Sequence, residues 1–207
     1  MLDGRCVLVT GDDPGLGGAI ARGLEAFGAT ASTVALADLA GHAGPVDVVV
    51  HVPTSGLERA PITATSPEEW ARRCETVLRD ALTCSRGTFA LLRSSGGLLV
   101  FVTPTLGMTG AAELVPYASA VEGMRAMAKS AARQWGRDGI RVNCVAPSAE
   151  QLRSAAGAWS PDVGEPALGA APAGPEAVAA AIALLADERS PITGATIVVD
   201  GGVVMVP

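Results

Sequence analysis

Short apolar runs alternate along the chain with longer segments in which apolar residues recur every three or four positions. The apolar runs predict strands at residues 5–10, 29–35, 45–52, 98–103, 139–147 and 194–202. The segments with helical periodicity predict helices at residues 16–28, 66–92, 116–136 and 174–188. Strands that are apolar throughout belong to sheets buried on both faces. The pattern therefore predicts an α/β fold in one domain, residues 1–207, with a parallel sheet and helices on both of its faces.

Local signals mark the ends of several elements. The long helix is expected to begin with a capping box and a proline in its first turn, a pattern carried by Ser66, Pro67 and Glu69. Gly28 is typical of the C-cap of the first helix. Asp47 and Asn143, both in strand segments, are expected to make structural hydrogen bonds. Residues 147–173 are rich in proline, glycine and alanine, which predicts a loop.

Composition and charge narrow the range of functions. Hydrophobic residues make up 49% of the chain and charged residues 17%, which excludes a disordered protein. No apolar run approaches the ~18 residues of a membrane span, and no cationic leader precedes an apolar segment, so we expect a cytoplasmic protein. The net charge of −6, without a basic run, makes nucleic acid and anionic membranes poor partners. The cysteines are widely spaced, which predicts buried thiols and no metal site.

A glycine-rich turn follows the first predicted strand. In a parallel α/β sheet, such a turn aims backbone N–H groups and a helix N-terminus at a bound pyrophosphate. The candidate cofactor-binding residues in this turn are Gly11, Gly15, Leu16 and Gly17. Asp12 and Asp13 lie inside the same turn, and a carboxylate ~6 Å from a phosphate costs roughly 1–3 kcal/mol at an effective dielectric near 20–40. Binding of a dinucleotide and glycines that serve packing alone both stay open at this point.

Several motifs together resemble the short-chain dehydrogenase/reductase family, and its ketoacyl-reductase-like branch in particular. They are "TGDDPGLG", "PVDVVV", "SPEEW", "PYASA" around Tyr117, "GIRVNCVAP" and "PITGATIVVDGG". The resemblance implies a doubly wound, Rossmann-like sheet and NAD(P)-dependent oxidoreductase chemistry. In that family a tyrosine is the general acid or base, and a lysine four residues later lowers its pKa and holds the nicotinamide ribose. A serine positions the substrate carbonyl, and an asparagine supports a proton relay.

Of these four catalytic residues of the family, this chain matches only the tyrosine, at Tyr117. It places Val121 at the lysine position, Pro104 at the serine position and Val77 at the asparagine position. The only lysine of the chain is Lys129, which lies about 18 Å beyond Tyr117 along a helix. An unassisted tyrosine has a pKa near ~10, so at neutral pH it donates a hydrogen bond but is a poor base.

The residues that line the cofactor-binding site in the family are also replaced in this chain. The "NNAG" stretch is replaced by "HVPT", in which His51 and Val52 stand for the two asparagines, and Leu152 takes the place of the threonine that holds the nicotinamide amide. The predicted strand at residues 45–52 corresponds to the fourth strand of the family. Only residues 35–45 separate it from the second strand, whereas a βαβ unit needs ~30 residues. We therefore expect the third strand and a crossover helix to be missing.

Together these departures predict a protein that keeps the family fold but not its redox chemistry. We expect a non-catalytic subunit without a bound cofactor, assembled with a competent family member such as a ketoreductase or a 3-hydroxyacyl-CoA dehydrogenase. The expected contacts are helices 66–93 and 116–136 and the C-terminal strand. One alternative is an NAD(P)-dependent reductase that uses Tyr117 in an atypical site. A second is a non-redox enzyme in which His51 and Tyr117 form an acid–base pair.

Overall fold

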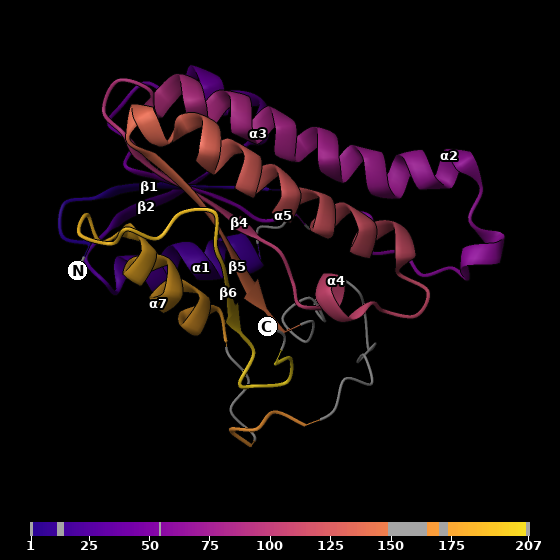
Figure 1. The fold of residues 1–207 in the computed structure, drawn as a ribbon. Coiled ribbons are helices and arrows are strands. Elements are labelled where there is room, and N and C mark those ends of the chain that lie inside the picture. The colour runs from indigo at the N-terminus through magenta and orange to yellow at the C-terminus, as the bar shows by residue number, and fades with distance from the viewer. Residues whose placement is uncertain (1, 12–14, 54, 149–164, 170–173, 206–207) are drawn as a thin grey trace.

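The computed structural model describes residues 2–11, 15–53, 55–148, 165–169 and 174–205 and confirms the predicted α/β fold (Figure 1). Its six strands pair in parallel in the order β2-β1-β3-β4-β5-β6. They are β1 (Cys6–Thr10), β2 (Thr30–Val34), β3 (Val48–His51), β4 (Gly97–Val102), β5 (Ile140–Pro147) and β6 (Thr196–Val199). Each lies within one of the predicted strand segments or differs from it by a single residue.

Helices cover both faces of the sheet, as the apolar strands require (Figure 1). On one face lie α1 (Leu16–Glu25) and α7 (Pro175–Ala186), and on the other lie α3 (Thr76–Leu92) and α5 (Val115–Trp135). The predicted long helix begins as α2 (Pro67–Trp70) and passes through the π-helical turn η3 (Ala71–Glu75) into α3. The capping box at Ser66 is confirmed, because its hydroxyl accepts the Glu69 N–H and the Glu69 carboxylate accepts the Ser66 N–H.

Shorter helices complete the described part of the fold. Three are 3-10 helices: η1 (Leu36–Gly41), η2 (Ile62–Ala64) and η4 (Gly136–Asp138). The fourth is α4 (Leu106–Thr109), which lies against the start of α5 (Figure 1). The sequence analysis did not predict α4, because four residues are too few to show a helical period. No helix in the described ranges is both long enough and apolar enough to cross a bilayer.

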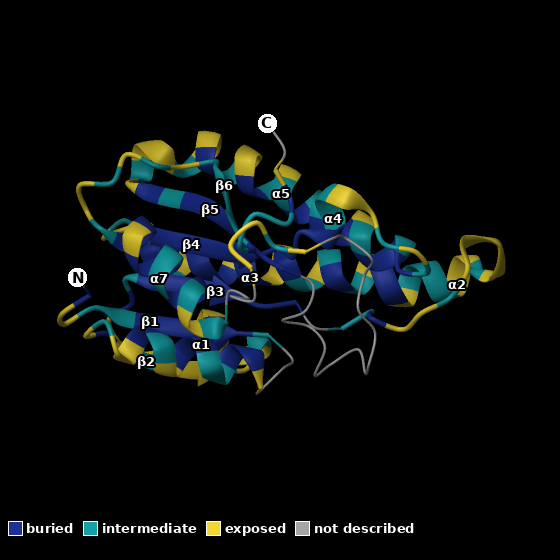
Figure 2. Ribbon diagram, turned by 90° about the horizontal axis from the view of Figure 1, so that it is seen from below, coloured by how far each residue is buried: buried dark blue, intermediate teal, exposed yellow. Residues whose placement is uncertain are grey.

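The segment between β2 and β3 confirms that the third strand and a crossover helix of the family are missing. From Val34 to Val48 the chain forms only η1, so β2 is an edge of the sheet. Its residues are correspondingly more exposed than those of β3 and β4 (Figure 2). Leu39 of η1 is buried against α3, and a Cβ built on Gly87 would lie 3.2 Å from the Leu39 side chain. The short helix η1 thus takes the place of the missing strand and crossover helix, and it packs directly on α3.

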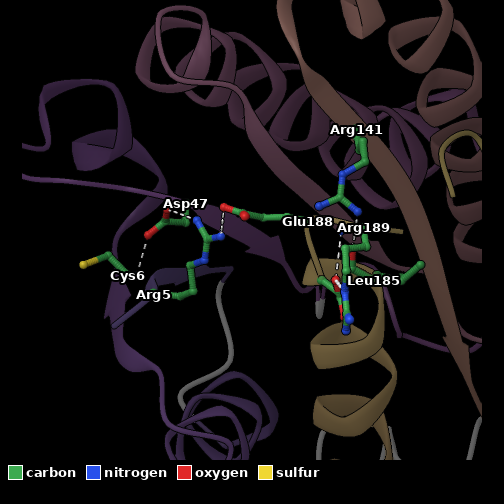
Figure 3. A network of polar contacts seen from close by, with 8 residues as sticks. Arg5, Cys6, Asp47, Arg141, Leu185, Glu188 and Arg189 are labelled. Atoms are coloured by element: carbon green, nitrogen blue, oxygen red, sulfur yellow. Dashed lines mark hydrogen bonds and ion pairs between the residues drawn. The ribbon is translucent and has the colours of Figure 1, made fainter. Parts of the chain in front are cut away.

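Charged side chains tie the strands to α7 at the amino edge of the sheet (Figure 3). Arg5 pairs with Asp47 at 2.8 Å and also with Glu188, which follows α7. Arg141 of β5 donates to the carbonyl of Leu185. These contacts confirm the expected structural role of Asp47. The charged side chains also line a pocket of about 440 Å³, at the edge of the sheet opposite to the candidate site.

Asn143 has a structural role of the same kind within β5. Its side chain donates to the Ile192 carbonyl at 2.9 Å and accepts from the Ala195 N–H at 3.0 Å. Both partners lie in the segment that leads into β6. The expectation for Asn143 is therefore confirmed.

Candidate active site

The candidate site lies at the carboxyl edge of the sheet, where ligands of doubly wound folds bind. The glycine turn follows β1, the "HVPT" segment begins at the last residue of β3, and the "TPT" segment follows β4. From the side, α5 contributes Tyr117 and Val121, and α3 contributes Val77. The fold thus brings the segments that the sequence singled out to one edge of the sheet.

Tyr117 is oriented into the protein core. Its side chain is fully buried, and its hydroxyl donates a hydrogen bond of 2.8 Å to the carbonyl oxygen of Pro53. Desolvation by burial disfavours the phenolate and raises the pKa of Tyr117 above its ordinary value of about 10. The proton of this hydroxyl is therefore held more firmly than in water, which is the opposite of what a general base requires.

The lysine position of the family is closed by packing. Val121 is fully buried, and a Cβ built on Gly107 would lie 2.6 Å from the Val121 Cγ2 atom, so α4 lies directly on this side chain. Pro104 and Val77, at the serine and asparagine positions, are buried as well. None of the three side chains can donate or accept a proton.

His51 is a second titratable group at this edge of the sheet, and Asp80 lines the same small cavity. It is 1% exposed, and neither ring nitrogen has a hydrogen-bond partner among the described residues. Its ring meets Phe101 edge to face, with centroids 6.0 Å apart. Desolvation lowers the pKa of His51 to about 4, so the imidazole is neutral at pH 7. His51 lines a cavity of about 10 Å³, which has room for about one water molecule.

The two residues proposed as an acid–base pair are not joined in the described structure. The Tyr117 hydroxyl is bonded to the carbonyl of Pro53, two residues after His51, and no hydrogen bond links it to the imidazole. The sequence placed both side chains near one another but did not identify Pro53 as the acceptor of the Tyr117 proton.

Among the described glycines of the turn after β1, Gly11 is the one whose backbone surroundings exclude a side chain. Gly11 has φ +145°, and a Cβ there would lie 2.0 Å from the Val52 carbonyl oxygen. At Gly17 a Cβ would touch Val9 at 3.5 Å. Gly15 is the N-cap of α1 with φ −73°, which any residue adopts, and Leu16 is buried. Asp12, Asp13 and Leu152 lie outside the described residues.

A cavity of about 190 Å³ lies between the carboxyl ends of β1 and β2. Its lining residues are Val9, Thr10, Gly11, Gly17, Thr33, Val34, Ala35 and Val52. Pockets that bury whole ligands measure ~300–1,000 Å³, so this cavity offers space for part of a dinucleotide. A second cavity, of about 10 Å³, lies beside His51. At this edge the described residues therefore leave more open space beside Gly11 and Thr33 than beside His51.

Comparisons with known proteins identify the family. A family model described as enoyl-(acyl carrier protein) reductase matches residues 29–204. The chain is 34% identical over 178 residues to a cis-4-hydroxycyclohexanecarboxylate dehydrogenase of Sinomonas cyclohexanicum, covering 83% of this chain and 71% of that protein. It is 30% identical to the 3-oxoacyl-(acyl-carrier-protein) reductase of Salmonella typhimurium over an alignment of 244 residues, covering 99% of both chains. That alignment is longer than this chain, so it contains gaps.

Solved structures have the same fold. A 3-ketoacyl-(acyl-carrier-protein) reductase from Brucella melitensis, complexed with NADH, superposes with a TM-score of 0.80 over 98% of this chain and 99% of that chain, at 20% identity. A putative short-chain dehydrogenase/reductase from Burkholderia xenovorans gives a TM-score of 0.75 at 26% identity, over 98% of this chain and 97% of that chain. The chain belongs to the short-chain dehydrogenase/reductase family, as a ketoacyl-reductase-like member.

Proposed function

We propose that this chain is a non-catalytic subunit that assembles with a catalytically competent oxidoreductase of its own family, such as a ketoreductase or a 3-hydroxyacyl-CoA dehydrogenase. The observation that carries the proposal is the position of Tyr117. Its hydroxyl is bonded to the Pro53 carbonyl inside the core, and burial raises its pKa. A tyrosine hydroxyl in this state is a poor general acid and a poor general base at neutral pH.

The surroundings of Tyr117 support the same proposal. General acid–base catalysis by a tyrosine near pH 7 needs a cation that lowers its pKa, and the nearest position for one holds the buried Val121. The only lysine of the chain is Lys129, two turns farther along α5. Arg125 is directed elsewhere, since it bonds Glu122 and the Thr196 hydroxyl.

Two surfaces of the described fold are available for assembly. The two helices α3 and α5 lie side by side on one face of the sheet, and no described element covers their outer surface (Figure 1). At the far side of the sheet, β6 is an edge strand. The exposed side chains of Leu168 and Met205 line a wide apolar pocket of about 710 Å³ beside it. These surfaces suit contacts with another subunit.

The test is purification of the tagged chain from its native host, followed by identification of bound proteins by mass spectrometry. The expected result is a stoichiometric complex with a related chain that has lysine four residues after its tyrosine. Reconstituted activity is expected to be unchanged by Tyr117→Phe in this chain and lost on the same change in the partner. A chain that runs alone, with no related subunit attached, would refute the proposal.

An NAD(P)-dependent reductase with an atypical site is the second candidate. The cavity of about 190 Å³ beside Gly11 and Gly17, at the place where the family holds adenosine, favours it. Calorimetric titration with NAD⁺, NADH, NADP⁺ and NADPH separates the two candidates. Micromolar binding, together with a reductase activity that Tyr117→Phe abolishes, would replace the first proposal with the second.

A further inference from the structure

The outward face of α3 carries a row of arginines. Arg79, Arg86 and Arg93 follow one another at intervals of seven residues, and all three are exposed. Seven residues are nearly two helical turns, so the three side chains start from one line along the helix at intervals of about 10 Å. No described carboxylate pairs with any of them, whereas Arg72, one interval earlier, pairs with Glu58.

The neighbouring helix adds to the positive charge of this surface. On α5, Lys129 and Arg133 are exposed. The acidic Glu122 of α5 is occupied by Arg125, at 2.7 Å, and Glu75 is the one exposed acid near the row on the long helix. The outer surface of α3 and α5 is therefore strongly basic, although the whole chain has a net charge of −6.

The same surface has an apolar and small centre. Leu82 lies between Arg79 and Arg86 and is 51% exposed. Beside it, α5 approaches α3 closely at Gly123, where a Cβ would lie 2.8 Å from the Leu78 side chain. An apolar centre with charged groups around it is the arrangement of a protein–protein interface. A site for single-stranded nucleic acid would instead expose aromatic side chains, and the described exposed hydrophobic residues include none.

We propose that the outer surface of α3 and α5 docks an acidic helical surface of a different, related subunit and disfavours a second copy of this chain. In a two-fold symmetric dimer, each surface meets an identical one. Two copies would therefore bring the arginine rows together with too few carboxylates to balance them, and like charges across an interface select against that pairing. This inference rests on the proposed function and specifies the partner's chemistry.

A charge-swap experiment tests the surface itself. In an antiparallel pair of α3 helices that meet at Leu82, Arg79 of one copy faces Arg86 of the other. The variant R79E/R86E should therefore bind labelled wild-type chain roughly 10–100-fold more tightly than wild type binds itself at low ionic strength, and salt should weaken that binding. The control R22E/R189E changes the net charge equally, on α1 and after α7, and should bind no more tightly than wild type.

Three results would overturn the inference. The first is wild-type chain that dimerises at low salt through this surface, detected as a dimer lost on Leu82→Asp. The second is a mixture of wild type and R79E/R86E that does not associate. The third is wild-type binding to duplex DNA or to vesicles containing phosphatidylserine that R79E/R86E abolishes, because the surface would then serve a nucleic acid or a membrane.

The native complex separates a failure of this inference from a failure of the proposed function. If a related subunit co-purifies with wild type, R79E/R86E should release at least about nine-tenths of it, while R22E/R189E retains it. Full retention by R79E/R86E would refute the charged contact and leave the non-catalytic subunit intact. Absence of any related subunit would refute the proposed function itself.

Discussion

Restoring the family lysine at residue 121 is expected to destabilise the protein rather than to revive catalysis. Val121 is fully buried under α4, with its Cγ2 atom 2.6 Å from the position of a Cβ on Gly107. A lysine ammonium there would leave water. Buried lysines have pKa values of ~5–6, against ~10.4 in an unfolded chain. At pH 7 the native state would hold the amine neutral, and removing its proton costs about 4–5 kcal/mol at ~1.36 kcal/mol per pH unit.

The pH dependence of this loss identifies its cause. Between the two pKa values, the unfolded state of V121K binds one more proton than the native state. Stability therefore rises by ~1.4 kcal/mol per pH unit, and the electrostatic loss falls to about 2 kcal/mol at pH 9. The matched variant V121M has a similar length and no charge, so it costs only ~1–3 kcal/mol from overpacking, without a pH slope.

The assay is urea denaturation of wild type, V121K and V121M at pH 7, 8 and 9, with the free energy of unfolding extrapolated to water. The reasoning is refuted if V121K is as stable as V121M at every pH, because the ammonium would then reach water and the lysine position would be open. NAD(P)-dependent reduction of a ketone by V121K would refute it more directly.

Three further variants follow from the same site. Tyr117→Phe should lower the free energy of unfolding by roughly 1–3 kcal/mol, since it leaves a buried carbonyl without its donor, as measured by urea denaturation. His51 has a native pKa of about 4 against ~6.5 unfolded, so stability should fall by up to about 3 kcal/mol as the pH drops from 6.5 to 4; acid titration of His51→Gln should lack this component. Gly11→Ala, with its Cβ 2.0 Å from a carbonyl oxygen, should lower the free energy of unfolding by more than ~2 kcal/mol, whereas Gly41→Ala, which has open space around it, should lower it little, both measured by urea denaturation.

Tyr117 has a structural reason to persist without catalysis. Its ring fills the core between α5 and the segment after β3, and its hydroxyl satisfies the Pro53 carbonyl, which a phenylalanine would leave unpaired. The same holds for Gly11, whose replacement by any other residue would collide with the backbone at Val52. Tyr117 and Gly11, which belong to the active site in the family, are therefore both explained by packing in this chain.

Most of the fold was predictable from local pattern. The inner strands β1, β3 and β4 are nearly continuous apolar runs because the middle of the parallel sheet is buried on both faces. The capping box at Ser66 marks the start of the long helix through its own side chain. The shortness of residues 35–45 was enough to predict the missing strand, since a crossover unit needs a minimum length of chain. The helix α4 escaped prediction because its four residues are held by packing on α5 and not by a sequence period.

The sequence by itself determined the family, the α/β fold, the missing third strand and the absence of a lysine four residues after Tyr117, because each of these depends on residue type and spacing along one chain. Only the tertiary structure decided what Tyr117 does, since its acceptor Pro53 is 64 residues away and its burial comes from α5 packing on the sheet. It also decided that α4 closes over Val121 and that the arginines of α3 face outward together. Such contacts join segments that are distant in sequence, and no local pattern encodes them.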